Sequence, residues 1–329
     1  GISTELWSSL LDKKSSYPLT NRAVSGVYPA ASTFKAFSSM AGLQFGIIGP
    51  DTTHDCKGYW DAYGKQWGQK CWIYPGHHGV LGLEEAIKHS CDIYFYNVGA
   101  DFYKAWQAEP AQARVDDYQN YVKTWGFGSV SGIDLPGEAS GRIPDAAWKA
   151  QTFVDTPEEA QWQPGDMTNM CIGQGDILVT PLQICNGYAA IARRQMLTPH
   201  LFKSALDSDA APVVTYTPIP PTTTPEVVPE HVKRVERGCE MVVTQTNLFD
   251  DLPIKVAGKS GTGEVSGKDD ISWYVAYGPV EKPKYCVVCV VEQGGGGSTT
   301  AIQGVAQTFA KLYDTSAGSI TLRSATNER

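Results

Sequence analysis

The chain has 329 residues, of which 42% are hydrophobic and 19% charged, and its formal net charge at pH 7 is −8. This apolar content is enough to bury a sizeable core, which excludes an intrinsically disordered protein. The acidic balance disfavours a nucleic-acid binder, which needs a basic face, so we expect no nucleic-acid partner. Apolar runs such as Cys286–Val291 are far shorter than the ~20 residues that span a bilayer.

The predicted elements run from an early helix to a late sheet. Thr180 and Pro181 suit the N-cap and first position of one helix. Apolar residues at helical spacing predict helices at 32–43, 83–105 with a break near 90–92, 180–193, 229–243 and 299–313. Strands are expected at 255–259, 272–277 and 285–291, and the short turns between them predict antiparallel pairing. This order favours an α+β fold.

Three segments lie outside these elements. The proline- and threonine-rich stretch 212–229 predicts an exposed extended connection, either a domain linker or a long loop. Gly294–Gly297 predicts a tight turn, and 315–329 a frayed polar tail. The chain begins with Gly1 and an amphipathic stretch, so we expect it to be part of a longer protein.

The first motif with chemical meaning is Ser32-Thr33-Phe34-Lys35, which puts a serine and a lysine on one face of a helix. A lysine can activate a serine hydroxyl if burial and nearby cations lower its pKa towards neutrality. The N–H groups of a helix N-terminus also suit an oxyanion. Alone, the pattern is equally typical of an ordinary solvated helix turn.

The second motif, Ser90-Cys91-Asp92, lies in the predicted helix break. From such a loop the Ser90 hydroxyl could relay a proton between a lysine and a leaving amine. The alternative is an ordinary cap with Asp92 as N-cap of the next helix, a role compatible with the first.

The third motif, Lys259-Ser260-Gly261-Thr262, is expected at the end of a strand. An edge strand can pair with an extended peptide, and Gly261 lets its backbone approach a ligand closely. Lys259 and the two hydroxyls could hold a carboxylate. The alternative is a glycine-rich hairpin turn.

Together and in this order, the motifs are the signature of penicillin-binding proteins and serine β-lactamases. The chain resembles the transpeptidase domain of class B penicillin-binding proteins, above all the elongation-type members called penicillin-binding protein 2. Where the family usually has Pro-Gly before the nucleophile, this chain has Ala30-Ala31. Further matching segments are 18–22, 28–31, 173–175, 180–183 and 272–279.

The resemblance implies a central antiparallel sheet flanked by helices, with a helical subdomain at roughly 80–200 inserted in a domain of 1–314. It also implies a membrane anchor and a pedestal domain in the parent protein, which would lie on the extracytoplasmic face of the bacterial cell membrane. A glycosyltransferase of the elongation complex would be its partner.

The resemblance further implies the role of each motif residue. Ser32 would be acylated by the D-Ala-D-Ala stem peptide of peptidoglycan or by a β-lactam, with Lys35 as general base. Ser90 would pass a proton to the leaving D-alanine, and Asp92 stands where related enzymes often carry asparagine. The N–H groups of Ser32 and Thr262 would form the oxyanion hole, worth ~3–4 kcal/mol per donor. The carboxylate would be bound by Lys259, Ser260, Gly261 and Thr262.

A structural zinc site is the second expectation. Cys56, Cys71, Cys91 and either His77 or His78 form the ligand set of a closed tetrahedral zinc site. The stretch 51–79 has few aliphatic residues, so a metal would help to hold it. The resemblance favours His78, because some relatives place zinc ligands in this stretch. The alternatives are a disulfide, which leaves an odd thiol, and free buried cysteines.

The remaining cysteines are expected to be small buried hydrophobes. Cys286 and Cys289 form a C-x-x-C pattern, but a strand would point them to opposite faces.

The function implied is a D,D-transpeptidase that needs no catalytic cofactor and is inhibited by β-lactams. The middle block lacks the E-x-x-L-N pattern of a fast β-lactamase, which favours slow deacylation. The alternatives are a D,D-carboxypeptidase or β-lactamase of the same fold, a non-enzymatic penicillin sensor, and a structural partner in a wall-synthesis complex.

Overall fold

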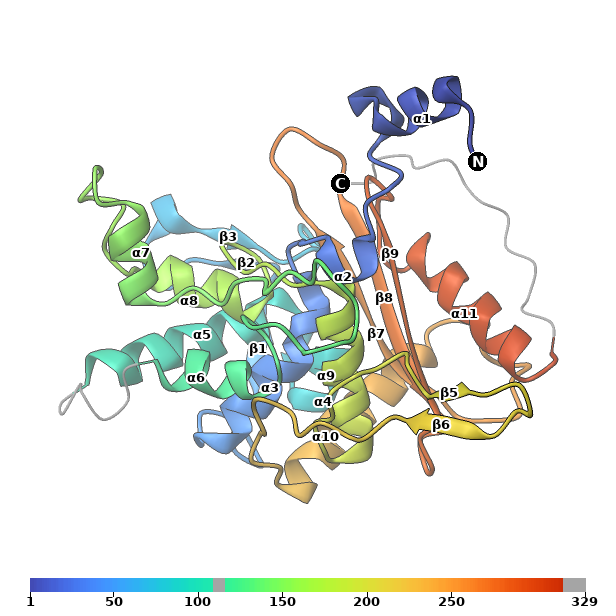
Figure 1. Cartoon of the computed structure of the whole chain (residues 1–329). Coiled ribbons are helices and arrows are strands. Elements are labelled where there is room, and N and C mark those ends of the chain that lie inside the picture. The colour runs from blue at the N-terminus through green and yellow to red at the C-terminus, as the bar shows by residue number, and fades with distance from the viewer. Residues whose placement is uncertain (109–115, 316–329) are drawn as a thin grey trace.

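The computed structural model describes residues 1–108 and 116–315, and all but the first residue of the predicted tail lies outside them. At its centre is an antiparallel sheet in the order β7-β8-β9 (Figure 1). Lys259 pairs with Val275, and Tyr274 with Cys289, which confirms the predicted antiparallel pairing. The strands are β7 (Ala257–Gly263), β8 (Ile271–Gly278) and β9 (Tyr285–Val291).

Helices cover both faces of this sheet. Every residue of β8 is buried, and its side chains alternate between two hydrophobic clusters. Trp273 and Val275 join the larger cluster, whereas Tyr274 packs with α11 (Ala301–Leu312) on the other side. On the side of the larger cluster lie α3 (Lys35–Gln44), α9 (Pro181–Arg193) and α10 (Pro229–Val243).

The predicted helices are all present. The helix expected at 32–43 starts with a 3-10 turn, η2 (Ala31–Phe34), which leads into α3. The expected break falls between α4 (Leu83–Lys88) and α5 (Asp92–Gln107). α9 begins with a capping box in which the side chains of Thr180 and Gln183 each accept the other's backbone N–H.

The third motif lies in the last part of β7 as expected, but the predicted end of this strand at Lys259 is wrong. β7 continues through Lys259-Ser260-Gly261-Thr262 to Gly263, and Gly261 pairs with Trp273. Glycines are poor strand formers, but the full register with the buried strand β8 outweighs this local preference. The hairpin-turn alternative fails for the same reason.

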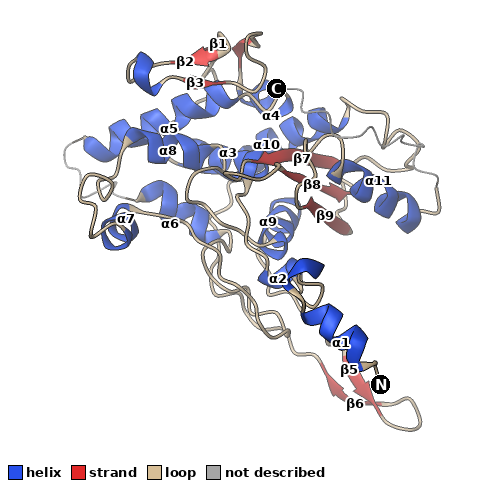
Figure 2. Cartoon of the chain, turned by 90° about the horizontal axis from the view of Figure 1, so that it is seen from above, coloured by secondary structure: helices blue, strands red, loops and turns tan. Residues whose placement is uncertain are grey.

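Other elements are too short to be predicted from residue patterns. β1 pairs with β4, and β2 with β3. β1 and β2 contact α5, apart from the central sheet (Figure 2). The further helices are α1 (Thr4–Leu11), α2 (Arg22–Ser25), α6 (Asp117–Thr124), α7 (Ala146–Thr152), α8 (Pro164–Cys171) and the 3-10 turns η1 (Lys13–Ser15) and η3 (Lys65–Trp67). The further strands are β1 (His54–Cys56), β2 (Tyr59–Trp60), β3 (Gln69–Lys70), β4 (Gly79–Leu81), β5 (Ser204–Leu206) and β6 (Pro212–Thr215).

The proline-rich stretch is a long loop. Its first residues form β6, which pairs with β5. Beyond that strand it returns to the body of the protein, where the Glu226 carbonyl accepts a hydrogen bond from Tyr121 and the Glu226 carboxylate one from Gln44.

The C-x-x-C prediction is confirmed. Cys286 packs against the larger hydrophobic cluster and Cys289 against the smaller one, on opposite faces of β9. All eight cysteines lie in the described part of the chain, and none forms a disulfide. Among the helices described, none is long and apolar enough to cross a membrane.

Candidate active site

The turn that carries Ser32 is fixed from three sides. The Ala31 N–H donates to the Gly173 carbonyl at 2.7 Å, and the Tyr188 hydroxyl donates to the Thr33 carbonyl at 2.7 Å. On the third side, a Cβ added to Gly261 would lie only 3.1 Å from Thr33 Cγ2 and 3.2 Å from Thr33 N. Because Gly261 has no side chain, β7 can approach this turn closely. Ser32 itself stays half-exposed.

Ala31 adopts a left-handed conformation, with φ of 51°. The family resemblance puts glycine at this position, and glycine adopts such angles without the steric cost that Cβ brings. Ala31 therefore adopts a turn that suits glycine better, at the cost of some strain.

Ser90 has the same kind of conformation, with φ of 51°. It ends α4 in a Schellman motif: the Ser90 N–H donates to Ile87 O, and the Cys91 N–H donates to Ala86 O. Glycine is the usual residue at such a position, so a serine here points to a need for its hydroxyl.

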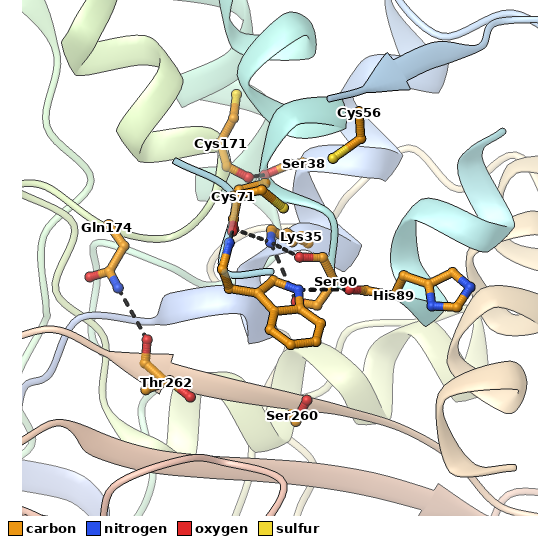
Figure 3. Close-up of polar contacts among 12 residues, drawn as sticks. Lys35, Ser38, Cys56, Cys71, His89, Ser90, Cys171, Gln174, Ser260 and Thr262 are labelled. Carbon is orange, nitrogen blue, oxygen red and sulfur yellow. Dashed lines mark hydrogen bonds and ion pairs between the residues drawn. The ribbon is translucent and has the colours of Figure 1, made fainter. Parts of the chain in front are cut away.

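That hydroxyl lies between two buried lysines, and Figure 3 shows one of them, Lys35, beside Ser90. Lys259 Nζ is 2.9 Å from Ser90 Oγ, and Lys35 Nζ is 3.4 Å from the same atom. Both lysines have no exposed surface. Lys35 also donates to the Ser90 carbonyl at 2.8 Å, and Lys259 to the Ser260 carbonyl at 3.0 Å.

One carboxylate compensates this buried charge. Asp92 Oδ1 pairs with Lys35 Nζ at 2.7 Å, and Asp92 Oδ2 accepts the Trp72 N–H at 2.9 Å. Asp92 is the first residue of α5, where the helix dipole favours a negative charge. The N-cap position belongs to Cys91, so the expectation that Asp92 is the N-cap is wrong. The Asp92 carboxylate pairs with Lys35 instead of capping the helix.

The electrostatics of Lys259 differ from those of an exposed lysine. Burial, and secondly the nearby charge of Lys35, lower the pKa of Lys259 to about 7. Near neutral pH this amine can therefore both bind and release a proton.

The edge of β7 completes the site. In the part of the chain that the structure describes, no strand pairs with the outer edge of β7. Ser260 and Thr262 are half-exposed there, while Lys259 and Gly261 are buried. Gln174 Nε2 donates to the Thr262 carbonyl at 3.1 Å, and the Gly297 N–H donates to Thr262 Oγ1 at 3.1 Å.

A cluster of metal-ligating side chains adjoins the second motif. One ligand atom each from Cys56, Cys71, His78 and Cys91 lies within 4.8 Å of the others. His78 Nδ1 is 3.4 Å from Cys56 Sγ and 3.7 Å from Cys71 Sγ. His77 is exposed and outside the cluster, so His78 is the histidine that could join the cysteines. A hydrogen bond from the Cys91 thiol lowers the pKa of Cys71, which favours the thiolate that a metal requires.

The structure thus brings Lys35, Ser90, Asp92 and Lys259 into one group and the metal-ligating side chains into an adjoining one, and it places the turn of Ser32 against β7. Sequence reasoning missed Trp72, Gln174 and Gly297. Trp72 and Gly297 act through their backbone N–H groups, which leave no residue-type signature. Gln174 had a signal, because it lies in Gly173-Gln174-Gly175, a segment that matches the family.

Comparison with known proteins settles the family. The model of the penicillin-binding protein transpeptidase domain matches residues 7–314. The chain belongs to this family. The predicted α+β penicillin-binding-protein fold and the family resemblance are therefore both confirmed.

Relatives of this penicillin-binding-protein domain include peptidoglycan D,D-transpeptidases named MrdA. It is 32% identical over 322 residues to the peptidoglycan D,D-transpeptidase MrdA of Haemophilus influenzae, covering 92% of this chain and 46% of that protein. With the Escherichia coli K12 protein of the same name it shares 29% over 318 residues, covering 90% and 47%. The chain thus spans about half the length of the curated relatives it matches.

Solved structures of penicillin-binding proteins are similar to this chain over most of its length. The crystal structure of Pseudomonas aeruginosa PBP2 in complex with WCK 5153 has a TM-score of 0.77 and 29% identity, covering 95% of this chain and 67% of that one. PBP2 of Helicobacter pylori in its complex with MreC also has a TM-score of 0.77, with 28% identity and coverage of 95% and 54%.

The left-handed conformation of Ser90 generates a testable prediction. Ser90→Gly and Ser90→Ala both delete the hydroxyl between the lysines, but only glycine relieves the backbone strain. We expect Ser90→Gly to be more stable than Ser90→Ala by ~1 kcal/mol, and both to acylate far more slowly than wild type. Urea unfolding and penicillin labelling measure the two effects. Equal stability of the two variants contradicts the assigned strain.

Proposed function

We propose that this chain is the catalytic domain of a peptidoglycan D,D-transpeptidase, in which Ser32 forms an acyl-enzyme. The observation that carries this is the meeting of two fully buried lysines at the Ser90 hydroxyl, next to the turn of Ser32 and the open edge of β7. Relatives of the same family are named peptidoglycan D,D-transpeptidases.

In the first step, Ser32 Oγ attacks the carbonyl carbon of the penultimate D-alanine. The peptide bond breaks, the terminal D-alanine leaves as an amine, and an ester on Ser32 remains. The N–H groups of Ser32 and Thr262 would stabilise the oxyanion. An extended stem peptide would pair with the free edge of β7, and Ser260, Thr262 and Lys259 would receive its terminal carboxylate.

Lys35 must be neutral to accept the Ser32 proton, yet in the free enzyme it is paired with Asp92. Ser90 Oγ connects it to Lys259, whose pKa is lowered to about 7. A substrate carboxylate beside Lys259 would raise the pKa of Lys259 again, and draw a proton from Lys35 through Ser90. Lys35 is then the base, and Ser90 can pass a proton to the leaving amine.

In the second step, an amine of a neighbouring stem peptide attacks the ester, and Ser32 is released with a new peptide cross-link. Hydrolysis by water instead would make the chain a D,D-carboxypeptidase or a β-lactamase. A sensor would stop at the acyl-enzyme. Turnover separates these activities, because only transpeptidation yields both free D-alanine and a new amide.

The parent protein would act with partners at the extracytoplasmic face of the bacterial membrane. A PBP2 relative has been solved in complex with MreC, and another similar structure is a peptidoglycan synthase complex. By similarity to these proteins we propose a comparable scaffold and a glycosyltransferase as partners of the full-length protein.

We also propose a structural zinc ion held by Cys56, Cys71, Cys91 and His78. The residues fit, because their ligand atoms already converge and the pKa of Cys71 is lowered. When bound, the metal would tie the stretch from Cys56 to His78 to the second motif, in which Cys91 lies. Cys71 is followed by Trp72, whose N–H holds Asp92, so the cluster positions the carboxylate that pairs with Lys35.

The acyl-enzyme is tested by intact-protein mass spectrometry after incubation with benzylpenicillin. We expect one adduct, mapped to the peptide that contains Ser32, and none on Ser32→Ala. Heat-unfolded wild type serves as the control for non-specific labelling. A folded wild-type protein that gains no adduct, or gains it elsewhere, contradicts the proposed nucleophile.

The acylation rate should depend on pH through Lys259. Below about pH 7 Lys259 already carries a proton and cannot take one from Lys35 through Ser90. The second-order rate constant for acylation should therefore rise about tenfold per unit towards pH ~7 and level off above it. Lys259→Arg, which keeps its charge, should be slow throughout and lack this inflection. A wild-type rate that falls through pH 7 contradicts the proton path.

The metal is tested by native mass spectrometry on protein purified with zinc and without chelators. We expect one zinc per chain, lost in Cys56→Ser and retained in the control Cys289→Ser. At a zinc concentration 1,000 times Kd the ion adds ~4 kcal/mol to the free energy of unfolding, so a chelator should lower Tm of wild type but not of Cys56→Ser. Wild type without zinc, or Cys56→Ser with it, contradicts the site.

A further inference from the structure

The side chain of Gln174 joins the loop after α8 to the strand β7. It lies just after α8, and its side-chain amide donates to the Thr262 carbonyl of β7 at 3.1 Å (Figure 3). The two residues are 88 positions apart in the sequence. Gln174 is half-buried and lies next to the site, yet the acyl-transfer steps proposed above give it no role.

The loop of Gln174 is held rigidly. α8 ends in a Schellman motif, in which the Gly173 N–H donates to Met170 O and the Gln174 N–H donates to Asn169 O. Gly173 has φ of 75°, and a Cβ added to it would lie 2.1 Å from the Ala31 carbonyl oxygen. The loop therefore lies so close to the turn before Ser32 that only glycine fits at position 173.

The same loop contacts both halves of the proposed oxyanion hole. The Gly173 carbonyl accepts the Ala31 N–H at 2.7 Å, directly before Ser32. Gln174 holds Thr262, and in an extended strand the N–H and C=O of one residue point to the same edge. The bond to the Thr262 carbonyl thus orients the residue whose N–H would face the oxyanion.

The other polar contact of Thr262 does not replace this one. The Gly297 N–H donates to Thr262 Oγ1, which fixes the side chain but not the peptide groups at the strand edge. Within the part of the chain that the structure describes, the Gln174 side chain thus connects the edge of β7 to the loop after α8, whose Gly173 contacts the turn before Ser32.

We infer that Gln174 is a positioning residue that sets the separation of the two oxyanion-hole donors, the N–H groups of Ser32 and Thr262. This inference rests on the proposed acyl-enzyme mechanism and adds to it a residue that touches neither substrate nor nucleophile. Such a residue affects the transition states of both acylation and deacylation, because both pass through an oxyanion at the same place. It leaves the first, non-covalent binding of the substrate largely unchanged.

The test is stopped-flow kinetics with benzylpenicillin on the wild-type chain, Gln174→Ala and Gln174→Glu. Glutamate has the size of glutamine, but its carboxylate has no N–H to donate to Thr262. The control is Gln303→Ala, which removes the same kind of bond, from Gln303 Nε2 to the Thr299 carbonyl, on the exposed face of α11. We expect both Gln174 variants to lose about 10-fold in the acylation rate constant and to slow in deacylation in parallel. The dissociation constant of the first complex and Tm should stay near wild type, and Gln303→Ala should be unchanged.

The outcomes are distinct. A weaker first complex with an unchanged acylation rate constant means that Gln174 only lines the substrate site, and overturns the inference. So does a Gln174→Glu variant with wild-type rates, since it lacks the bond. Loss of rate in acylation alone, without slower deacylation, also overturns it. If wild type forms no adduct on Ser32, the proposed function fails, and this inference fails with it. If wild type acylates normally and the Gln174 variants have the same rates, only the inference fails.

Discussion

Two lysine side chains are fully buried within reach of one serine hydroxyl, and a single carboxylate offsets their charge. Burying an amine is tolerable only when partners replace its water, and removing one partner of such a group typically costs several kcal/mol. Lys35 comes from α3, Lys259 from β7, and Ser90 and Asp92 from the break between α4 and α5. The packing of the helical part against the sheet therefore serves to keep these four side chains in contact.

Backbone strain is concentrated around this group. Ala31 and Ser90 are both left-handed. Ala31 directly precedes the proposed nucleophile Ser32, and Ser90 lies on the proposed proton path. Alanine and serine do not favour this conformation, so the surrounding hydrogen bonds must hold it. Ala31 is held by its bond to the Gly173 carbonyl, and Ser90 by its bond to the end of α4. Stability given up at such positions is typical of sites where function sets the geometry.

The meeting of Lys35, Ser90 and Lys259 could be predicted from the sequence, because the three motifs depend on residue types at fixed spacings. Helix ends with polar caps, such as Thr180 of α9, were predictable because the cap also needs a particular side chain. The extent of β7 was not, since its glycines argue locally against a strand and only the register with β8 overrides them. Contacts that depend on backbone groups, such as the Trp72 N–H on Asp92, have no pattern in the residue types at all.

The most direct measurement is a crystal structure of the benzylpenicillin adduct. The account predicts an ester on Ser32 Oγ, with the acyl oxygen within hydrogen-bond distance of the Ser32 and Thr262 N–H groups. It also predicts the drug carboxylate beside Ser260, Thr262 and Lys259, with Ser90 Oγ still between the two lysines. An adduct on another residue, or an acyl oxygen that points away from β7, would contradict the central claim that the buried lysines and the edge of β7 form one acyl-transfer site.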